Sequence, residues 1–337
     1  MSGRLRSACL SFGLLLAVAA CAAPAAQTVV STRPGEIVIL HTNDIHGNIE
    51  PVQHIYKPGD SPVLAGGAAS LATLIERTRR ACGDSNVLLL EAGDIYQATA
   101  EGNEYRGRLS VDIMNRLRYD FMTLGNHEPD YDVVNCEALI RRSRFPWMGE
   151  NMRDAATGQR PALFAGPRLI ERNGVRIGIF GITTEDMAVL TTLAKENERS
   201  WMVLPELPVA EQTARQLRDS GAEVVILLSH VGVDHDSAIA ARLGAPETGA
   251  RRPLVDLIVG GHSHTRLDSP LLVRGVMIVQ TGWRGVACGE VRIAWDSAAR
   301  RISSLRGRLI DLLPDRYPPD SGMQAFLDPY VAEIEKR

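Results

Sequence analysis

Five short polar clusters carry side chains of the kinds that divalent metals bind. They contain aspartate, asparagine and five of the eight histidines of the chain. In chain order they are Asp44–His46, Gly93–Asp94, Gly125–Glu128, His230 and Gly261–His264. Imidazole, carboxylate and amide oxygen suit borderline divalent ions, and no cysteine thiolate lies in any cluster. The residue types therefore predict metal chemistry, and their number favours a site for two ions.

Each cluster comes directly after an apolar run that is typical of a buried strand. These runs are Ile37–His41, Val87–Leu90, Phe121–Leu124, Val224–Ser229 and Leu254–Val259. Side chains two residues apart point the same way at a strand end, so Asp44 and His46 can reach one ion, and the spacing of His262 and His264 repeats this strand-end pattern. We therefore expect the five clusters to converge at one edge of a sheet, an arrangement that core packing does not explain.

The elements that position these clusters alternate between strand and helix in the first half of the chain. Helices are predicted at Ala68–Ala81, Ser110–Leu117, Val133–Arg142, Val209–Ser220 and Gly322–Lys336. Alternation favours parallel strands with right-handed crossovers. Beyond residue 265 the strand candidates Val276–Gln280, Ala287–Trp295 and Ile302–Ile310 are joined by short turns, which predicts antiparallel pairing. A mixed α/β sandwich of two sheets accounts for both halves.

The composition places the chain among ordinary globular proteins. It has 337 residues, 45% of them hydrophobic and 23% charged, with a net charge of −3. A nucleic-acid binder would normally show a basic stripe, so no nucleic-acid partner is expected. The four tryptophans are scattered, which favours core packing over a base-stacking platform. We predict one domain over residues 35–315, followed by a C-terminal helix over residues 316–337.

The first 21 residues have the character of an export signal. A basic start is followed by the apolar stretch Leu10–Ala20, which is too short to span a membrane, and by small residues before Cys21. This resembles a bacterial lipobox and predicts lipidation of Cys21. The alternative is an ordinary signal peptide cut near Ala23 or Ala26. Either interpretation predicts an exported protein, and lipidation predicts a membrane-anchored lipoprotein facing the periplasm or cell envelope.

Two further expectations follow from export. Residues 22–34, rich in alanine, proline, threonine and serine, are predicted to form a flexible tether. Export also permits one disulfide among Cys82, Cys136 and Cys288, without indicating which pair.

The five clusters in their strand contexts resemble the motif set of the calcineurin-like metallophosphoesterases. Within them the chain is similar to the N-terminal catalytic domain of the bacterial 5′-nucleotidase and UDP-sugar hydrolase family. The matching strings are Ile39–Gly47, Glu91–Asp94, Thr123–Glu128, Leu228–His230 and Gly260–His264, within residues 36–312. The resemblance implies a four-layer αββα sandwich of two mixed β-sheets. It also implies two divalent ions, Zn²⁺ or Mn²⁺ first, with Co²⁺, Mg²⁺ or Fe as other candidates.

The resemblance also implies roles for individual residues. One ion would be held by Asp44, His46, Asp94 and His264, and the other by Asp94, Asn126, His230 and His262. Asn126 and His127 would contact the substrate phosphate. His127 would be a catalytic residue oriented by Asp130. The alternative for Asp130 is a helix N-cap before Val133–Arg142.

The implied activity is a phosphomonoesterase of the 5′-nucleotidase type, acting on a nucleotide or similar ester in the cell envelope. The alternatives are a phosphodiesterase or pyrophosphatase of the UDP-sugar or cyclic-nucleotide type, or a metal- and phosphate-binding lipoprotein without turnover. Two departures from the family pattern stand out. Pro129 replaces the usual aromatic residue and fixes the local φ beside Asp130. The nucleotidase C-terminal domain, which selects the nucleoside, is not expected in this chain.

Overall fold

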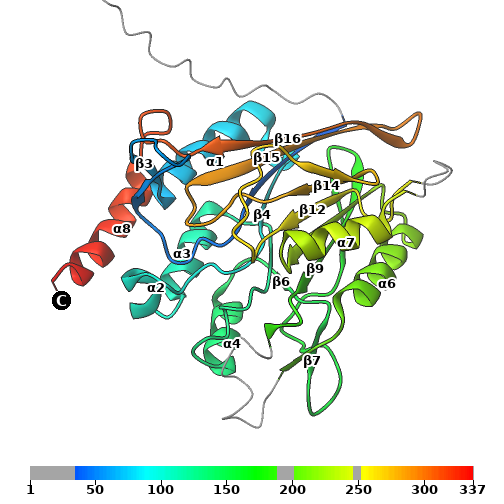
Figure 1. The fold of residues 1–337 in the computed structure, drawn as a ribbon, viewed down its shortest axis with the longest axis horizontal. Helices are drawn as coiled ribbons and strands as arrows, with labels where there is room; N and C mark the ends of the chain where they lie inside the picture. Colours follow the sequence, from blue (N-terminus) through cyan, green and yellow to red (C-terminus); the bar gives the residue numbers. More distant parts are fainter. Residues whose placement is uncertain (1–34, 188–200, 246–251, 337) are drawn as a thin grey trace, which may run out of the picture.

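The computed structural model describes residues 35–187, 201–245 and 252–336. Two six-stranded mixed sheets pack face to face, and helices cover both outer faces (Figure 1). The predicted αββα sandwich of two mixed sheets is confirmed. The predicted signal segment, Cys21 and the tether lie outside the described residues, so their assignment stays a prediction.

The first sheet has the strand order β16-β15-β1-β4-β5-β6. Its strands are β1 (Glu36–Thr42), β4 (Val87–Glu91), β5 (Phe121–Thr123), β6 (Trp147–Met148), β15 (Ala287–Asp296) and β16 (Arg301–Asp311). β1, β4, β5 and β6 run parallel, whereas β15 pairs antiparallel with both β1 and β16. Every residue of β4 and all but the first of β1 are buried, as expected for central strands covered on both faces.

The second sheet has the order β13-β14-β12-β11-β9-β8. Its strands are β8 (Arg168–Arg172), β9 (Val175–Thr183), β11 (Val224–His230), β12 (Leu257–Gly260), β13 (Leu271–Val273) and β14 (Val276–Val279). β9, β11, β12 and β14 run parallel. The expectation that all strands beyond residue 265 pair antiparallel is therefore wrong for β14. This strand follows the short hairpin strand β13, which reverses the chain and returns it parallel to β12.

Helices pack on the outer face of each sheet. The first sheet is covered by α1 (Ala68–Cys82), α3 (Arg108–Leu117), α4 (Val133–Arg142) and α8 (Ser321–Ile334), with the short α2 (Ala100–Glu104) beside them. The second sheet is covered by α6 (Glu206–Asp219) and α7 (Val233–Leu243). A third apolar cluster fills the space between the sheets. The predicted helices match observed ones within a few residues, but α2 and α7 were not predicted.

Small elements complete the fold. They are the hairpin of β2 (Pro51–His54) and β3 (Val63–Gly66), the pair β7 (Met152–Asp154) and β10 (Trp201–Val203), and the 3₁₀ turn η1 (Asp84–Asn86). Cys82, Cys136 and Cys288 are all buried thiols, so none forms the disulfide that export would permit. Among the described helices, none has the length and apolar character needed to cross a membrane.

Candidate metal centre

The predicted ligand residues gather where the two sheets present the carboxyl ends of their parallel strands. Asp44, Asp94 and Asn126 follow β1, β4 and β5 of the first sheet. His230 is the last residue of β11, and His262 follows β12 in the second sheet. Parallel strands end at the same edge, so residues more than two hundred positions apart are brought together.

The first group of candidate ligands consists of Asp44, His46 and His264, whose ligand atoms lie within 4.8 Å of one another. His264 Nε2 is 2.9 Å from His46 Nε2 and 3.3 Å from Asp44 Oδ1. Asp44 and His46 are buried, and His264 is half-buried. These three side chains can therefore hold one divalent ion.

The second group consists of Asp94, His230 and His262, again with ligand atoms within 4.8 Å of one another. Asp94 Oδ2 is 3.1 Å from His230 Nε2. Asn126 Oδ1 joins this group at 3.1 Å from His230 Nε2 and 2.8 Å from His262 Nδ1. Asp94 Oδ2 is also 3.9 Å from His46 Nε2, so this carboxylate lies between the two groups.

The chemistry of these donors fits bound cations. His230 Nδ1 is 2.6 Å from the Ala92 carbonyl and donates to it, which directs Nε2 towards Asp94. When the imidazole is neutral, its Nε2 lone pair, the Asp94 carboxylate and the Asn126 amide oxygen converge without a proton between them. A cation between them removes the repulsion.

Backbone strain is concentrated at these residues. Thirteen described non-glycine residues have positive φ, and five of them are candidate ligands. They are Asp44 (52°), His46 (49°), Asp94 (61°), His262 (76°) and His264 (52°). Each left-handed residue costs about 1–3 kcal/mol and persists only where its surroundings over-determine it. Packing alone gives no reason to place aspartate and histidine there, so the strain is evidence for a functional site.

Two glycines permit the close approach of the loops. A Cβ at Gly93, whose φ is 94°, would lie 2.7 Å from His230 Nδ1. A Cβ at Gly125 would lie 2.2 Å from Asp94 Oδ1. Both positions therefore exclude a side chain because candidate ligands occupy the space.

Glu128 holds the loops after β4 and β5 together, a role that the sequence analysis did not assign. Its buried carboxylate accepts hydrogen bonds from the backbone amides of Asp94 (3.1 Å), Ile95 (2.8 Å) and Gly125 (2.7 Å). Burial raises the pKa of Glu128 to about 7. Its place beside His127 in the third cluster was the available signal.

Asn43 was also missed, although it precedes Asp44 directly. Its Nδ2 donates to Asp44 Oδ2 and to the Gly282 carbonyl, each at 2.7 Å. Its Oδ1 accepts from the Thr281 amide at 2.8 Å. Asn43 therefore orients the Asp44 carboxylate and ties the end of β1 to the loop after β14.

His127 and Asp130 form a pair at the edge of the two groups. His127 Nδ1 is 2.7 Å from Asp130 Oδ2, and this hydrogen bond raises the pKa of His127 to about 9. The His127 ring is 5.3 Å from the His46 ring. The alternative N-cap role belongs instead to Asp132, whose side chain accepts from the Asn135 amide at 2.6 Å.

The charges of the second group oppose the effect of burial. Burial alone would raise the pKa of Asp94, but the facing imidazoles of His230, His127 and His46 lower it below its usual range. Burial alone would lower the pKa of His230, yet the Asp94 and Asp44 carboxylates raise it to about 10. Without metal this pair therefore favours an ionised carboxylate against a protonated imidazole, and a bound cation takes the place of that proton.

The expectation that the tryptophans serve core packing is wrong for Trp283. Its ring is half-buried and stacks on the His264 imidazole, with centroids 5.0 Å apart and planes 8° apart. The Arg284 guanidinium lies 3.8 Å from the centre of the same ring. Trp283 thus fixes the orientation of a candidate ligand. Trp147, by contrast, is fully buried as expected.

The three histidines outside the clusters take no part in the two groups. His41 is buried within β1, and burial lowers its pKa to about 3, so it is a neutral core residue. His54 lies in β2 and contacts Tyr56 edge-to-face. His235 lies in α7, where its Nδ1 is 2.8 Å from Glu206 Oε2.

Comparison with known proteins identifies the family. The sequence profile of the calcineurin-like phosphoesterases matches residues 37–266. The chain belongs to this family. The chain is similar to the human 5′-nucleotidase, with 30% identity over 348 aligned positions that cover 96% of this chain and 56% of the human protein. A snake venom 5′-nucleotidase from Crotalus adamanteus is 32% identical, over 80% of this chain and 47% of the venom protein.

This phosphoesterase is also similar in structure to a solved 5′-nucleotidase. The 5′-nucleotidase precursor from Thermus thermophilus superposes with a TM-score of 0.77 at 27% identity, covering 89% of this chain and 59% of that one. This phosphoesterase spans about half the length of the curated relatives it matches. The two groups of candidate ligands lie within or next to the matched range of the family.

Proposed function

We propose that the chain is a dinuclear metal-dependent phosphoester hydrolase, a phosphomonoesterase of the 5′-nucleotidase type. The observation that carries the proposal is the convergence of two ligand groups on either side of one buried carboxylate, Asp94. Two-metal sites of hydrolases have ions ~3.5–4 Å apart, a separation that a shared carboxylate suits.

The proposed ligand sets follow the geometry. One ion is held by Asp44, His46, Asp94 and His264, and the other by Asp94, Asn126, His230 and His262. The distances among Asp44, His46 and His264 support this division, as do those from Asn126 to His230 and His262. Zn²⁺ or Mn²⁺ suits such mixed nitrogen and oxygen donors best, with Co²⁺, Mg²⁺ or Fe as further candidates.

The ions, when bound, supply an activated water and neutralise charge on the phosphoryl oxygens. The protein's own residues bind and orient the substrate. Asn126 and His127 flank the position of the phosphoryl group. Asp130 holds the Nδ1 proton of His127, which leaves Nε2 free to face the substrate. In the metal-free protein the hydrogen bond with Asp130 raises the pKa of His127 to about 9. A proton held on this imidazole would stabilise charge on the phosphoryl group or pass to the leaving oxygen.

The proposed substrate is a nucleotide or a similar small phosphate ester. The relatedness to 5′-nucleotidases supports this class. The chain carries a net charge of −3 and does not attract anions over long range, so phosphate recognition depends on local groups and on the ions.

We further propose that the protein acts in the cell envelope, anchored by lipid on Cys21. The lipobox-like residues before Cys21 support this location. Replacing Cys21→Ser should move the protein from the membrane fraction to the soluble fraction when the membranes are washed with high salt, which screens contacts with anionic lipid. Continued membrane association of this variant after the wash, with the signal removed, would contradict lipidation.

The activity is tested with purified protein, several divalent metals and a panel of esters. We expect turnover of nucleoside 5′-monophosphates and p-nitrophenyl phosphate that a chelator abolishes and added metal restores. Faster turnover of bis-p-nitrophenyl phosphate or of a UDP-sugar would reassign the activity to diesters or pyrophosphates. Metal binding without turnover of any ester would show a binding protein instead.

A further inference from the structure

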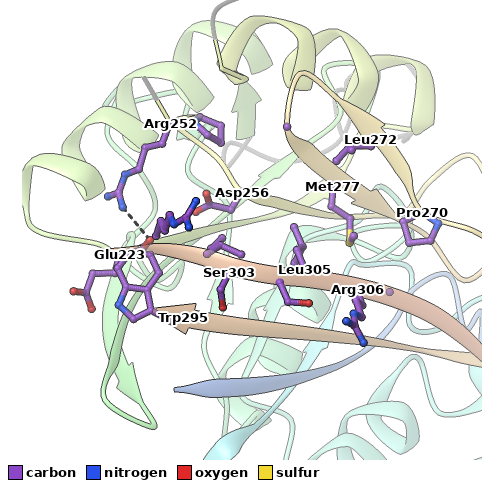
Figure 2. A pocket seen from close by; sticks show the side chains of 16 residues that line it. Glu223, Arg252, Asp256, Pro270, Leu272, Met277, Trp295, Ser303, Leu305 and Arg306 are labelled. Atoms are coloured by element: carbon purple, nitrogen blue, oxygen red, sulfur yellow. Dashed lines mark hydrogen bonds between the residues drawn. The ribbon is translucent and has the colours of Figure 1, made fainter. Parts of the chain in front are cut away.

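A large groove lies on the open edge of the sandwich, away from the candidate metal centre. It has a volume of about 740 Å³ and runs between β16 of the first sheet and the β13–β14 hairpin of the second (Figure 2). None of the candidate metal ligands lines it. The groove therefore has no part in the proposed hydrolysis and needs its own explanation.

The groove exists because two edge strands end the sheets without a covering layer. β16 is the outer strand of the first sheet, and β13 is the outer strand of the second. Between them the apolar core of the sandwich reaches the surface through Trp295, Met277 and the half-buried Leu305. Leu272 on β13 projects beside them and is 70% exposed, the largest exposed fraction of any large apolar residue in the described part of the chain. The groove thus has an apolar floor and an exposed leucine at its edge, which suits a partner with apolar groups.

The rim of the groove is basic, although the whole chain is acidic. Arg252, Arg301 and Arg306 line it and are exposed. Among the described residues, Arg301 and Arg306 have no carboxylate partner. The two acids of the groove are already paired: Asp256 Oδ2 is 2.6 Å from Arg218. Glu223 Oε1 is 3.6 Å from Arg176 and 3.9 Å from Arg300.

The groove lies where the described chain begins. The Trp295 amide donates to the Gly35 carbonyl at 2.9 Å, just before β1 starts. The candidate ligands begin at Asp44, beyond the other end of the same strand. Gly35, the first described residue, therefore lies beside the groove, and the metal centre lies beyond the opposite end of β1.

We propose that this groove and its arginine rim are the surface by which the domain lies on an anionic phospholipid membrane. The arginines contact lipid phosphates, while Leu272 and the apolar floor of the groove enter the interfacial layer. A lipid surface fits both the basic rim and the apolar floor. It also fits the position of Gly35 beside the groove, because the predicted lipidation site, Cys21, precedes Gly35 in the sequence. In this orientation the metal centre faces away from the lipid, open to dissolved substrates.

The inference concerns docking of the folded domain, so it is tested without the acyl anchor. The full chain with Cys21→Ser is mixed with vesicles of phosphatidylcholine alone or of phosphatidylcholine with phosphatidylglycerol, and sedimented. We expect binding to the phosphatidylglycerol vesicles, weakening as salt rises, and at least tenfold weaker binding to the neutral vesicles. Arg301→Gln with Arg306→Gln should weaken binding by about 30-fold. Arg108→Gln with Arg144→Gln, equally exposed but on the helical side of the first sheet, is the matched control and should change nothing.

A second measurement locates the contact. Brominated phospholipids should quench tryptophan fluorescence in the bound state, and Trp295→Phe should remove most of that quenching. Unchanged turnover of p-nitrophenyl phosphate by the Arg301 and Arg306 variant shows that it is folded. The inference is overturned if vesicles do not bind, if the control pair weakens binding equally, or if quenching persists without Trp295. Loss of turnover in all variants with intact vesicle binding would instead contradict the proposed hydrolase function.

Discussion

The two candidate metal groups use the same kinds of side chain, yet the protein holds them differently. In the group of Asp44, His46 and His264, all three residues have left-handed backbone conformations, and the His264 side chain is 37% exposed. In the other group, His230 is a regular residue of β11, fully buried, with its Nδ1 held by the Ala92 carbonyl. Left-handed loop residues occur in both groups, since Asp94 and His262 also have positive φ, but only the second group has a ligand, His230, that is part of a strand.

This difference leads us to expect unequal metal affinity. A ligand whose orientation is fixed by a second hydrogen bond loses little freedom when it binds an ion. His264 contacts Asp44 and His46 within its own group, and stacking on Trp283 orients it from outside the group at a partly exposed position. We therefore expect the ion of the Asp94–His230 group to bind more tightly and the ion of the Asp44–His264 group to exchange first.

The largest effect is expected where the two groups meet. Asp94→Asn removes the negative charge that both groups share, so both ions should be lost and turnover should fall by about three orders of magnitude or more. Elemental analysis and turnover of p-nitrophenyl phosphate measure the two effects. His264→Ala is the matched comparison and should lose only the weaker ion. Retention of two ions by Asp94→Asn would show that the groups are independent.

Substitution of His127 tests a residue that lies at the edge of the site and belongs to neither ligand group. His127→Ala should keep both ions, because no ligand is removed, yet lower the turnover number by about 10²–10⁴-fold. Asp130→Asn should lower it less, since the imidazole remains and only its partner changes. The metal content of each variant is the control. A loss of metal from His127→Ala would mean that this histidine is a ligand, contrary to the proposed role.

The order in which the two ions are lost measures the difference in metal affinity between the two groups. Titration of the loaded protein with a weak chelator should remove one equivalent before the other. Trp283→Ala should weaken the first equivalent by about 10–100-fold and leave the second unchanged, because the stacked ring orients only His264. Simultaneous release of both ions from each protein would remove the basis for distinguishing the groups.

Much of this site could be predicted from the sequence, because each candidate ligand stands next to the apolar run that identifies its strand. Each candidate ligand follows an apolar run, and parallel strands carry such residues to one edge, so Asp44, Asn126 and His262 could be placed together from the chain alone. The left-handed backbone at Asp44 and His46 could not be read in this way, because it results from loops packed against one another.

Other features depend on contacts between distant segments. Asn43 contacts the loop after β14, and Trp283 reaches His264 only after the second sheet is assembled. The error at β14 has the same origin, since β13 is too short to be recognised from its apolar pattern. The predicted fold class is correct despite this error, because the strands β1, β4 and β11 determine the two sheets.

A buried acid behind the Asp94–His230 group tests the surroundings of the ligands rather than the ligands themselves. Asp236 in α7 is fully buried, and a Cβ on Gly260 would lie 2.3 Å from its Oδ2. Burial raises its pKa from 3.8 to about 7. Folding therefore favours the protonated acid: this contribution to stability is complete below pH 3.8 and is lost as the pH rises to about 7.

Asp236→Asn should remove the loss of stability that accompanies ionisation of Asp236 as the pH rises. The free energy of unfolding of the variant minus that of the parent protein should rise by roughly 2–4 kcal/mol as the pH is raised from 4 to 8. Urea unfolding of both metal-free proteins at each pH measures the difference, and other titrating groups cancel. A difference that does not change with pH would show that Asp236 is ionised throughout and that burial of this region is less complete.

The central claim is that residues from both sheets hold two neighbouring ions around Asp94. Anomalous diffraction from crystals of the manganese- or zinc-loaded protein, recorded at the absorption edge of the metal, tests it most directly. We predict two peaks ~3.5–4 Å apart with the Asp94 carboxylate between them. A single peak, or peaks remote from His46 and His230, would contradict the account.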